Sequence, residues 1–353
     1  MNGAEALVRT LVKGGVDVCF TNPGTSEMHF VSALDRVEGM RSILVLYEGV
    51  ATGAADGYWR MADRPASTLL HLGPGLCNGL SNIHNARKAS SGFVNIIGEH
   101  ASWHLKFDAP LASDIEGLAR PLSHWVKTAP NSRAVASEAV NAILEARRGR
   151  IASLILPGDS AWEDSDGPAV TPNTSYLSNQ TGTIEAAARA LMSGEQSMLV
   201  IGGRAIRGEA LELAGRIAGK TGATLATQFF SSRVERGAGR VPTYRIPYFV
   251  DPALKALAGF KHFVTVETRE PVAFFAYPGK PSLLKPEGSH VHSICEPYGD
   301  GLAALRALAD ELNAKPEHAQ HQARGEALLP TGPLNQQSIA QILCALIPEN
   351  GIV

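Results

Sequence analysis

The stretch ILVLYEGVATGAADGY, residues 43–58, decides the fold, because an apolar strand-like run changes there into a helix-like run of small residues. Glu48 lies at the junction of the two runs. Ligands of α/β sheets bind in crevices at the carboxyl ends of strands, where a carboxylate is costly to bury without a hydrogen-bonding partner or a proton. Glu48 is therefore a candidate ligand-facing acid. The alternative is an acid in the first turn of the helix, attracted only by the helix dipole.

The composition is that of an ordinary globular protein. With 353 residues, 44% of them hydrophobic, the chain is long enough for two or more domains. Its 32 basic and 34 acidic residues give a net charge of -2 without long single-sign blocks, which argues against a nucleic-acid or membrane-surface partner. No apolar run reaches the roughly 20 residues that span a bilayer. Glu5 occupies a place where a secretory signal carries basic residues, which predicts a cytoplasmic location.

The spacing of cysteine and histidine gives no disulfide or metal signature. The four cysteines are far apart and include no C-x-x-C pair, so we expect small buried side chains rather than disulfides or zinc ligands. They are Cys19, Cys77, Cys295 and Cys344. His100 and His104 have the i, i+4 spacing of a metal-binding pair, but residues 98–110 lack a helical period. No metal ligand is predicted in this chain.

Strand-like and helix-like stretches alternate in both halves of the chain. The strands expected in the first half are 16–20, 43–47, 67–70, 94–97 and 152–156, with helices at 4–14, 27–35, 49–61, 76–90 and 137–148. Those expected in the second half are strands 198–201, 224–227, 262–267 and 290–295, with helices 183–193, 208–219 and 302–312. This alternation predicts the α/β fold class, with two doubly wound parallel-sheet domains.

The domain boundaries follow from a change in composition. Between Pro157 and Gly182 the pattern gives way to Ser, Asp, Asn, Pro and Thr, as in a linker. The resulting divisions are a first domain over 1–170, a linker over 171–182, a central domain over 183–313 and a final segment over 314–353.

Three strand ends of the first domain carry polar groups. Asn22-Pro23-Gly24 follows the first strand, Glu48 the second, and Gly73-Pro74-Gly75 with Asn78 the third. The carboxyl ends of parallel strands lie along one edge of the sheet, so these groups are expected to converge on a single crevice.

With these motifs the chain resembles the thiamine-diphosphate-dependent decarboxylase and carboligase family, in the branch of acetolactate synthase and benzoylformate decarboxylase. The resemblance covers residues 1 to about 315. It implies a pyrimidine-binding first domain and a Rossmann-like central domain. The family's third domain, which binds the diphosphate through Mg²⁺, is expected to be missing from this chain.

The resemblance implies a role for each motif. Asn22, Pro23, Gly24, Gly73 and Asn78 match cofactor-binding positions. The acid that Glu48 matches hydrogen-bonds a ring nitrogen of the aminopyrimidine and favours its imino tautomer. That tautomer takes the proton from the thiazolium carbon, and the cofactor performs the carbanion chemistry.

Three further residues match substrate-facing positions. His71 matches a histidine that acts as acid or base near the 2-oxo group. The alternative is a purely structural histidine, hydrogen-bonded at the strand end. Thr25, or its neighbour Ser26, matches a contact to the substrate carboxylate. For both, capping of the following helix is an alternative or additional role.

Two departures from the family pattern concern the substrate and a second cofactor. Leu111 takes the place of a glutamine that acetolactate synthases carry near the reaction centre, which weakens the case for acetolactate synthesis. Gly202-Gly203 is compatible with the flavin that those enzymes hold, so FAD stays open. The spacing to Gly208 does not make a G-x-G-x-x-G, and a simple chain reversal is the alternative.

The last part of the sequence is where a Mg²⁺-binding motif of the family would be sought. Gly299-Asp300-Gly301 looks like the family's metal motif, but no Asn-Asn follows, and Asp300 is better placed as the N-cap of helix 302–312. Residues 335–343 and 352–353 look like the first helix and strand of the third domain. We expect residues 327–353 to be disordered or paired with another chain.

The predicted function is thiamine-diphosphate-dependent decarboxylation, carboligation or both, acting on a small 2-oxo acid. A second subunit of a homodimer or homotetramer is implied, with helices 49–61 and 76–90 as the interface, unless their small residues serve packing onto their own sheet. This chain alone is expected to be inactive. The alternatives are a non-catalytic dimerisation or regulatory remnant, or one part of a split enzyme.

Overall fold

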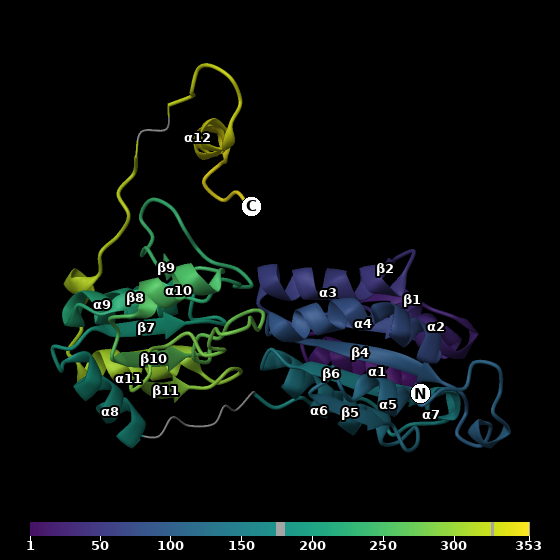
Figure 1. Ribbon diagram of the computed structural model, residues 1–353. Coiled ribbons are helices and arrows are strands. Elements are labelled where there is room, and N and C mark those ends of the chain that lie inside the picture. The colour runs from purple at the N-terminus through teal and green to yellow at the C-terminus, as the bar shows by residue number, and fades with distance from the viewer. Residues whose placement is uncertain (174–180, 326–327, 353) are drawn as a thin grey trace.

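The computed structural model describes residues 1–173, 181–325 and 328–352, which form two parallel-sheet units and a C-terminal helix (Figure 1). The first sheet has six strands in the order β2-β1-β3-β4-β6-β5, all parallel. They are β1 Val18–Asn22, β2 Arg41–Leu44, β3 Ser67–Leu70, β4 Phe93–Glu99, β5 Trp125–Thr128 and β6 Ile151–Pro157.

Helices cover both faces of this sheet. One face packs against α1 Gly3–Lys13, α2 Met28–Arg36, α6 Val135–Arg147 and α7 Gly158–Trp162. The other packs against α3 Glu48–Ala62, α4 Leu72–Lys88 and α5 Ile115–Ala119. Two short 3₁₀ helices, η1 Thr25–Glu27 and η2 Leu105–Phe107, lie in the loops after β1 and β4.

The second sheet has five parallel strands in the order β11-β10-β7-β8-β9. They are β7 Ser197–Ile201, β8 Thr224–Thr227, β9 Tyr244–Arg245, β10 His262–Val266 and β11 His290–Cys295. One face packs against α8 Thr181–Leu191, α9 Gly208–Thr221 and α11 Gly301–Glu311, and the other against α10 Val250–Leu257. A short 3₁₀ helix, η3 Pro316–His318, follows α11.

Each sheet has a switch point near its middle, where the chain reverses its direction of winding. In the first, the chain passes from β1 outward to β2 and returns to place β3 on the other side of β1. In the second, it passes from β7 to β8 and returns to place β10 on the other side of β7. Ligands of doubly wound sheets bind at such switch points, here the carboxyl ends of β1 and β3 and those of β7 and β10.

The predicted fold class is therefore confirmed, but several elements differ from the prediction. The strand expected at 43–47 is β2, which ends at Leu44 and lies at the exposed sheet edge, so that Leu46 is 97% exposed. The helix expected from residue 76 begins at Leu72, because Pro74 is tolerated in a first helical turn. The short elements β5, β9, α5 and α7 were not predicted, since each is too short to establish a clear apolar period. The eight-residue α10 was also missed, although its buried Val250, Ala253 and Leu257 follow a helical spacing.

The units touch through polar side chains from both. Asp63, which ends α3, forms ion pairs with Arg207 and Arg233 of the central unit. His124 of the first unit lies 3.1 Å through Nε2 from the Tyr298 hydroxyl of the second. Burial, and to a smaller extent two nearby arginines, lowers the pKa of His124 to about 4. A neutral imidazole therefore bridges the two units.

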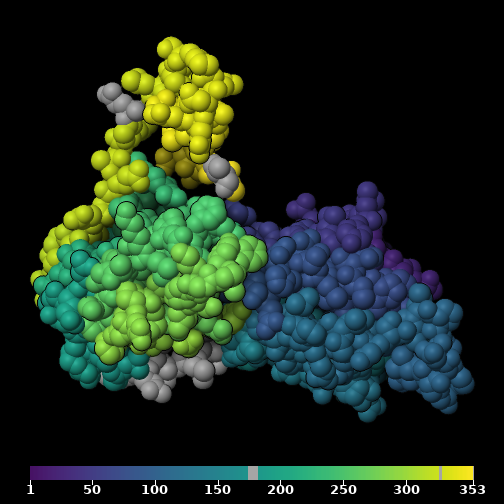
Figure 2. Space-filling model, viewed as in Figure 1, coloured from purple at the N-terminus to yellow at the C-terminus, as the bar shows by residue number. Residues whose placement is uncertain are grey.

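The C-terminal segment contains α12 Gln336–Leu346, close to the helix predicted at 335–343. It projects from the rest of the molecule (Figures 1 and 2), and its apolar Ile339, Leu343 and Leu346 are exposed. Residues 336–346 are helical, because the Asn335 cap and an apolar stripe form a helix. Of the two expectations for this segment, disorder or pairing with another chain, the helix favours pairing, which stays a prediction.

Two further predictions concern the linker and the cysteines. Most of the predicted linker, residues 174–180, and Val353 lie outside the described residues. Cys19 and Cys295 are buried, and burial raises the pKa of both thiols to about 12. Cys77 on α4 and Cys344 on α12 are exposed, so the expectation of four buried thiols was wrong for these two.

Across the described ranges, no helix is both long and apolar enough to cross a membrane.

Candidate functional site

Glu48 is the first residue of α3 and is only 7% exposed. Its Oε2 accepts a hydrogen bond of 2.9 Å from Asn78 Nδ2 on α4. A Cβ atom added at Gly75 would lie 2.9 Å from the other oxygen, Oε1, so that glycine leaves room for the carboxylate beside α4. Glu48 therefore occupies the first-turn position foreseen as an alternative, yet its carboxylate is directed to the neighbouring helix.

Asn22 connects the first strand to this acid. It ends β1, and its Nδ2 donates a hydrogen bond of 2.8 Å to the carbonyl of Val45 in the loop before Glu48. The Asn22 side chain thus fixes the path of the chain that delivers Glu48. Pro23 follows with no amide hydrogen to donate, which suits the turn out of the strand.

A buried carboxylate that was not predicted lies beside His71. Glu27 is 3% exposed, and its Oε2 accepts a hydrogen bond of 2.7 Å from the Gly24 amide and lies 2.8 Å from His71 Nδ1. A Cβ at Gly24 would lie 2.3 Å from the His71 ring, and one at Gly98 would lie 1.7 Å from Glu27 Oε1. Two glycines, one after β1 and one near the end of β4, therefore make room for the pair.

The sequence contains a signal for this pair. Glu27 is the third residue of η1, and its carboxylate returns to the backbone amide of Gly24, which is one half of a capping box. The sequence interpretation used Glu27 only as the start of a helix. It also proposed Thr25 or Ser26 as a cap, whereas the cap is the Glu27 carboxylate.

His71 lies at the carboxyl end of β3, in the N-cap position of α4. The next residue, Leu72, is fully buried and has a φ of +50°, in the left-handed region that non-glycine residues rarely adopt. Such backbone costs of order 1 kcal/mol or more and persists only where the surroundings enforce it, typically at functional sites. The buried Leu72 side chain thus fixes the turn from which His71 extends.

Thr25 and Ser26 border a cavity of about 290 Å³ at the same edge of the sheet. Its other lining residues are His29, Glu99, His100, Ala101, Trp103, His104, Gly158 and Trp162. Burial raises the pKa of Glu99, and a hydrogen bond from the His100 amide opposes that shift. Aromatic rings and one buried acid therefore lie directly beside the predicted substrate-contacting residues.

The loop before α5, which contains Leu111, packs against α4 at Gly73. Gly73 is in the first turn of α4, and a Cβ there would lie 2.3 Å from Ser113 Oγ, so the loop before α5 packs onto this turn. Leu111, in the same loop, is 42% exposed. In this structure the glycine accommodates the chain's own loop, and its cofactor-binding role stays a prediction.

His100 and His104 do come together, with ring centroids 5.6 Å apart. His104 also makes ring contacts with Trp103 and Phe107. Within the described ranges 1–173, 181–325 and 328–352, no group of three or more His, Cys, Asp or Glu is placed to hold a metal ion.

Comparison with known proteins identifies the family. Residues 1–119 match the model of the thiamine pyrophosphate enzyme, N-terminal TPP binding domain. The chain is 50% identical over 356 residues to IlvX of Mycobacterium tuberculosis, whose name places it with acetolactate synthase large subunits; the match covers 100% of this chain and 68% of that protein. The chain belongs to the thiamine-diphosphate-dependent enzyme family.

Solved structures show the same fold as this thiamine-diphosphate-dependent family member. A Mycobacterium smegmatis protein described as thiamin diphosphate-dependent superposes with a TM-score of 0.81 and 21% identity, covering 99% of this chain and 71% of that one. The 4-hydroxybenzoylformate decarboxylase of Rhodococcus jostii RHA1 superposes with a TM-score of 0.79 and 21% identity, covering 99% and 70%. At this identity the likeness concerns the fold alone.

The first switch point fits the aminopyrimidine ring of thiamine diphosphate. Within the described part of the chain, Asn78 is the only side chain that hydrogen-bonds the Glu48 carboxyl group, and Gly75 leaves the space beside Oε1 free of side-chain bulk. A buried carboxyl group with a fixed orientation is what a ring nitrogen at this position requires.

Proposed function

We propose that this chain carries the pyrimidine-activating half of a thiamine-diphosphate-dependent enzyme that decarboxylates or ligates a 2-oxo acid. The observation that carries the proposal is the buried Glu48 carboxyl group, held by Asn78 of α4 beside the β1–β3 switch point. A module that only assembles subunits needs no oriented acid at a strand end, which favours the catalytic proposal over a non-catalytic remnant.

In this proposal Glu48 holds a proton at the carboxyl oxygen that faces the ring nitrogen of the aminopyrimidine. Thiamine diphosphate, when bound, supplies the carbanion chemistry. Asn78 fixes the rotation of the carboxyl group, and Asn22 fixes the loop from which it extends. The protein contributes a preoriented acid, so little reorganisation is needed when the proton moves.

His71 is proposed as the acid or base that faces the 2-oxo group. Its Nδ1 lies 2.8 Å from Glu27, so a hydrogen bond donated to that carboxylate fixes the tautomer with Nε2 available for the substrate. A base oriented by a third group is the arrangement of several acid–base sites. Glu27 acts through His71 and is therefore a positioning residue.

The cavity of about 290 Å³ is proposed to hold the side chain of the 2-oxo acid. Thr25 and Ser26, on one wall, offer hydroxyl groups to the substrate carboxylate. Trp103 and Trp162, which also line the cavity, offer flat apolar surface that suits an aromatic or large aliphatic side chain.

A second subunit is proposed to complete the site. Leu44 and Leu46, at the β2 edge just before Glu48, are 73% and 97% exposed, and the nearby Tyr47 and Val50 are also exposed. Contiguous exposed apolar side chains typically mark an interface. We propose that a homodimer or homotetramer covers this edge and that a diphosphate-binding domain holds Mg²⁺. The small residues of α3 and α4 also pack these helices together, since a Cβ at Gly79 would lie 2.9 Å from Thr52.

The test is a substrate screen of the holoenzyme with thiamine diphosphate and Mg²⁺. Pyruvate, benzoylformate and related 2-oxo acids are offered, and carbon dioxide release and ligated products are both measured. We expect cofactor-dependent consumption of at least one 2-oxo acid. A folded, correctly assembled protein that binds thiamine diphosphate and consumes none of them would support the non-catalytic remnant instead.

A further inference from the structure

The central unit has its own switch point, between β7 and β10. Gly202 and Gly203 follow β7, Glu267 follows β10, and Gly301 begins α11 at the same edge of the sheet. In nucleotide-binding domains of this type, backbone N–H groups at such a turn and helix N-terminus bind the phosphates. A dinucleotide such as FAD would therefore place its diphosphate here.

The chain's own carboxylate already occupies these donors. Glu267 is 9% exposed, its Oε2 accepts a hydrogen bond of 2.5 Å from the Arg204 amide, and its Oε1 accepts one of 3.0 Å from the Gly301 amide. One amide lies in the turn after β7, and the other is the first of α11. A carboxylate thus bridges the two elements that would otherwise hold a phosphate.

The backbone at Glu267 is bent to achieve this position. Its φ is +51°, in the left-handed region, which is costly for a residue with a side chain. Burial raises the pKa of Glu267, while Arg204 and the backbone donors oppose that shift. The strained backbone persists because the carboxylate satisfies the buried N–H groups.

The glycines of this edge accommodate the carboxylate. A Cβ at Gly203 would lie 2.2 Å from Glu267 Oε2, and one at Gly301 would lie 2.4 Å from Oε1. A Cβ at Gly202 would lie 2.8 Å from the Glu267 carbonyl oxygen. The glycine pair that looked like a phosphate-binding turn is therefore needed for an internal contact, with no ligand required to explain it.

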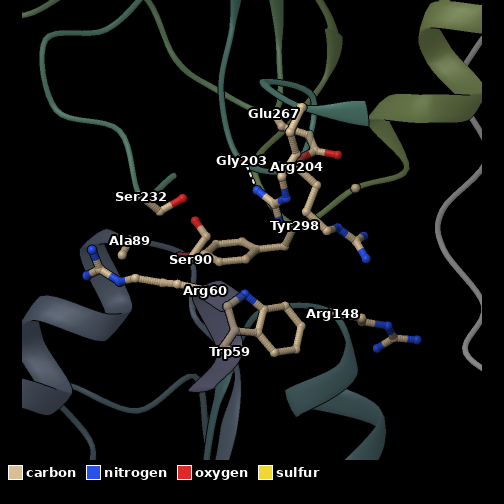
Figure 3. A pocket seen from close by; sticks show the side chains of 13 residues that line it. Trp59, Arg60, Ala89, Ser90, Arg148, Gly203, Arg204, Ser232, Glu267 and Tyr298 are labelled. Carbon is tan, nitrogen blue, oxygen red and sulfur yellow. Dashed lines mark hydrogen bonds between the residues drawn. The ribbon is translucent and has the colours of Figure 1, made fainter. Parts of the chain in front are cut away.

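The space beside Glu267 is also too small for a nucleotide. Figure 3 shows Glu267 near Gly203 and Arg204, with the rings of Trp59 and Tyr298 in the same pocket. The cavity measures about 20 Å³, which is room for a water molecule or two. Arginines at its wall are engaged by acids, as in the ion pairs Arg207–Asp63, Arg60–Asp56 and Arg148–Glu145.

We propose that Glu267 is a built-in anion that closes the second switch point, so that the central domain binds neither FAD nor another dinucleotide. The residues present do not fit the flavin that the family resemblance leaves open. The carboxylate takes the place of the diphosphate and joins the β7 turn to α11. This inference is independent of the proposed function, because it concerns the other sheet.

The first test uses the wild-type holoenzyme. It is denatured after purification, and flavin in the supernatant is measured by visible absorbance and fluorescence; FAD and ADP are then titrated into the native protein by calorimetry. We expect less than a tenth of an equivalent of flavin per chain and no saturable binding of either compound. About one equivalent of flavin, or saturable binding of FAD at this site, would overturn the proposal.

The second test removes the internal anion. Glu267→Ala keeps a side chain at the strained φ but frees the two amides, and Glu209→Ala, on the surface of the same unit, is the control. We expect Glu267→Ala alone to lose thermal stability and to regain several degrees of Tm with inorganic phosphate or ADP in excess. A folded Glu267→Ala variant that gains no more than the wild type and the control would overturn the proposal. If that variant does not fold, the wild-type titrations still decide.

Discussion

Adding one methyl group at Gly75, beside Glu48, should change activity while leaving stability nearly unchanged. A Cβ at Gly75 would lie 2.9 Å from Glu48 Oε1 and 3.3 Å from both the Leu70 carbonyl carbon and His71 Cβ. The perturbation is Gly75→Ala. Ordinary contact begins near 3.4 Å, so the carboxylate must move by about half an ångström.

Two effects of opposite sign contribute. Alanine stabilises a helix interior by about 1 kcal/mol relative to glycine. The displaced carboxyl group weakens the 2.9 Å bond from Asn78, and a typical intramolecular hydrogen bond contributes about 0.5–1.5 kcal/mol when intact. We therefore expect a free energy of unfolding close to that of the wild type. Since a misplacement of about 1 Å can cost on the order of a hundredfold in rate, kcat should fall by on the order of tenfold.

Gly57→Ala is the matched control. Gly57 also lies inside a helix, α3, and a Cβ there would meet no atom within 4 Å. It should gain up to about 1 kcal/mol, raising Tm by a few degrees, with kcat unchanged. Both variants are assayed by urea unfolding and by turnover of the best 2-oxo acid from the screen. Equal kcat values in Gly75→Ala and Gly57→Ala would refute the steric argument.

The remaining predictions concern His71 with its positioning residue Glu27, an interdomain histidine and a helix cap. Glu27→Gln and His71→Ala should each lower kcat by about a hundredfold, and the double variant should be no slower than the slower single variant, because the two residues act as one unit; steady-state kinetics of all three check this. Replacing His124 by Gln should flatten the fall in unfolding free energy between pH 6.5 and 4 by about 1 kcal/mol per pH unit, as urea titrations over that range would show. Asp300→Ala should cost about 1 kcal/mol by thermal unfolding, because Asp300 accepts from the Ala303 amide at the start of α11.

The sign of the His124 effect follows from the direction of its pKa shift. Its pKa in the folded protein, about 4, lies below the value of 6.5 expected when unfolded. The unfolded chain therefore binds the proton more tightly. The stability associated with the neutral imidazole is fully present above pH 6.5 and is lost as the pH falls towards 4. If unfolding free energy falls with pH as steeply in the variant as in the wild type, other groups determine the loss of stability at acid pH.

Much of the fold could be predicted because the sheets are buried on both faces. Runs such as those of β4 and β6 are wholly buried, and the sequence marks them clearly. The edge strand β5 was missed because its residues are only partly buried and carry a mixed pattern. Asp300 was correctly predicted as a cap, because its position before an apolar helical period is a local signal.

The site could be predicted only in part, for a physical reason. The positions of Glu48 at the start of a helix and of His71 at the end of a strand follow from local pattern. The contact of Glu27 with His71 joins residues 44 positions apart. It also requires that positions 24 and 98 carry no side chain, as their glycines ensure. Such contacts are set by the register of neighbouring strands, which a single sequence does not specify.

The central claim is that the Glu48 carboxyl group activates the coenzyme through its ring. The most direct test is the rate at which the thiazolium C2 proton of protein-bound thiamine diphosphate exchanges with deuterium, measured by rapid-quench NMR in the holoenzyme and in Glu48→Gln. The account predicts a fall of about a hundredfold or more in that rate, with the coenzyme still bound and the fold intact. An exchange rate in Glu48→Gln equal to that of the wild type would contradict it.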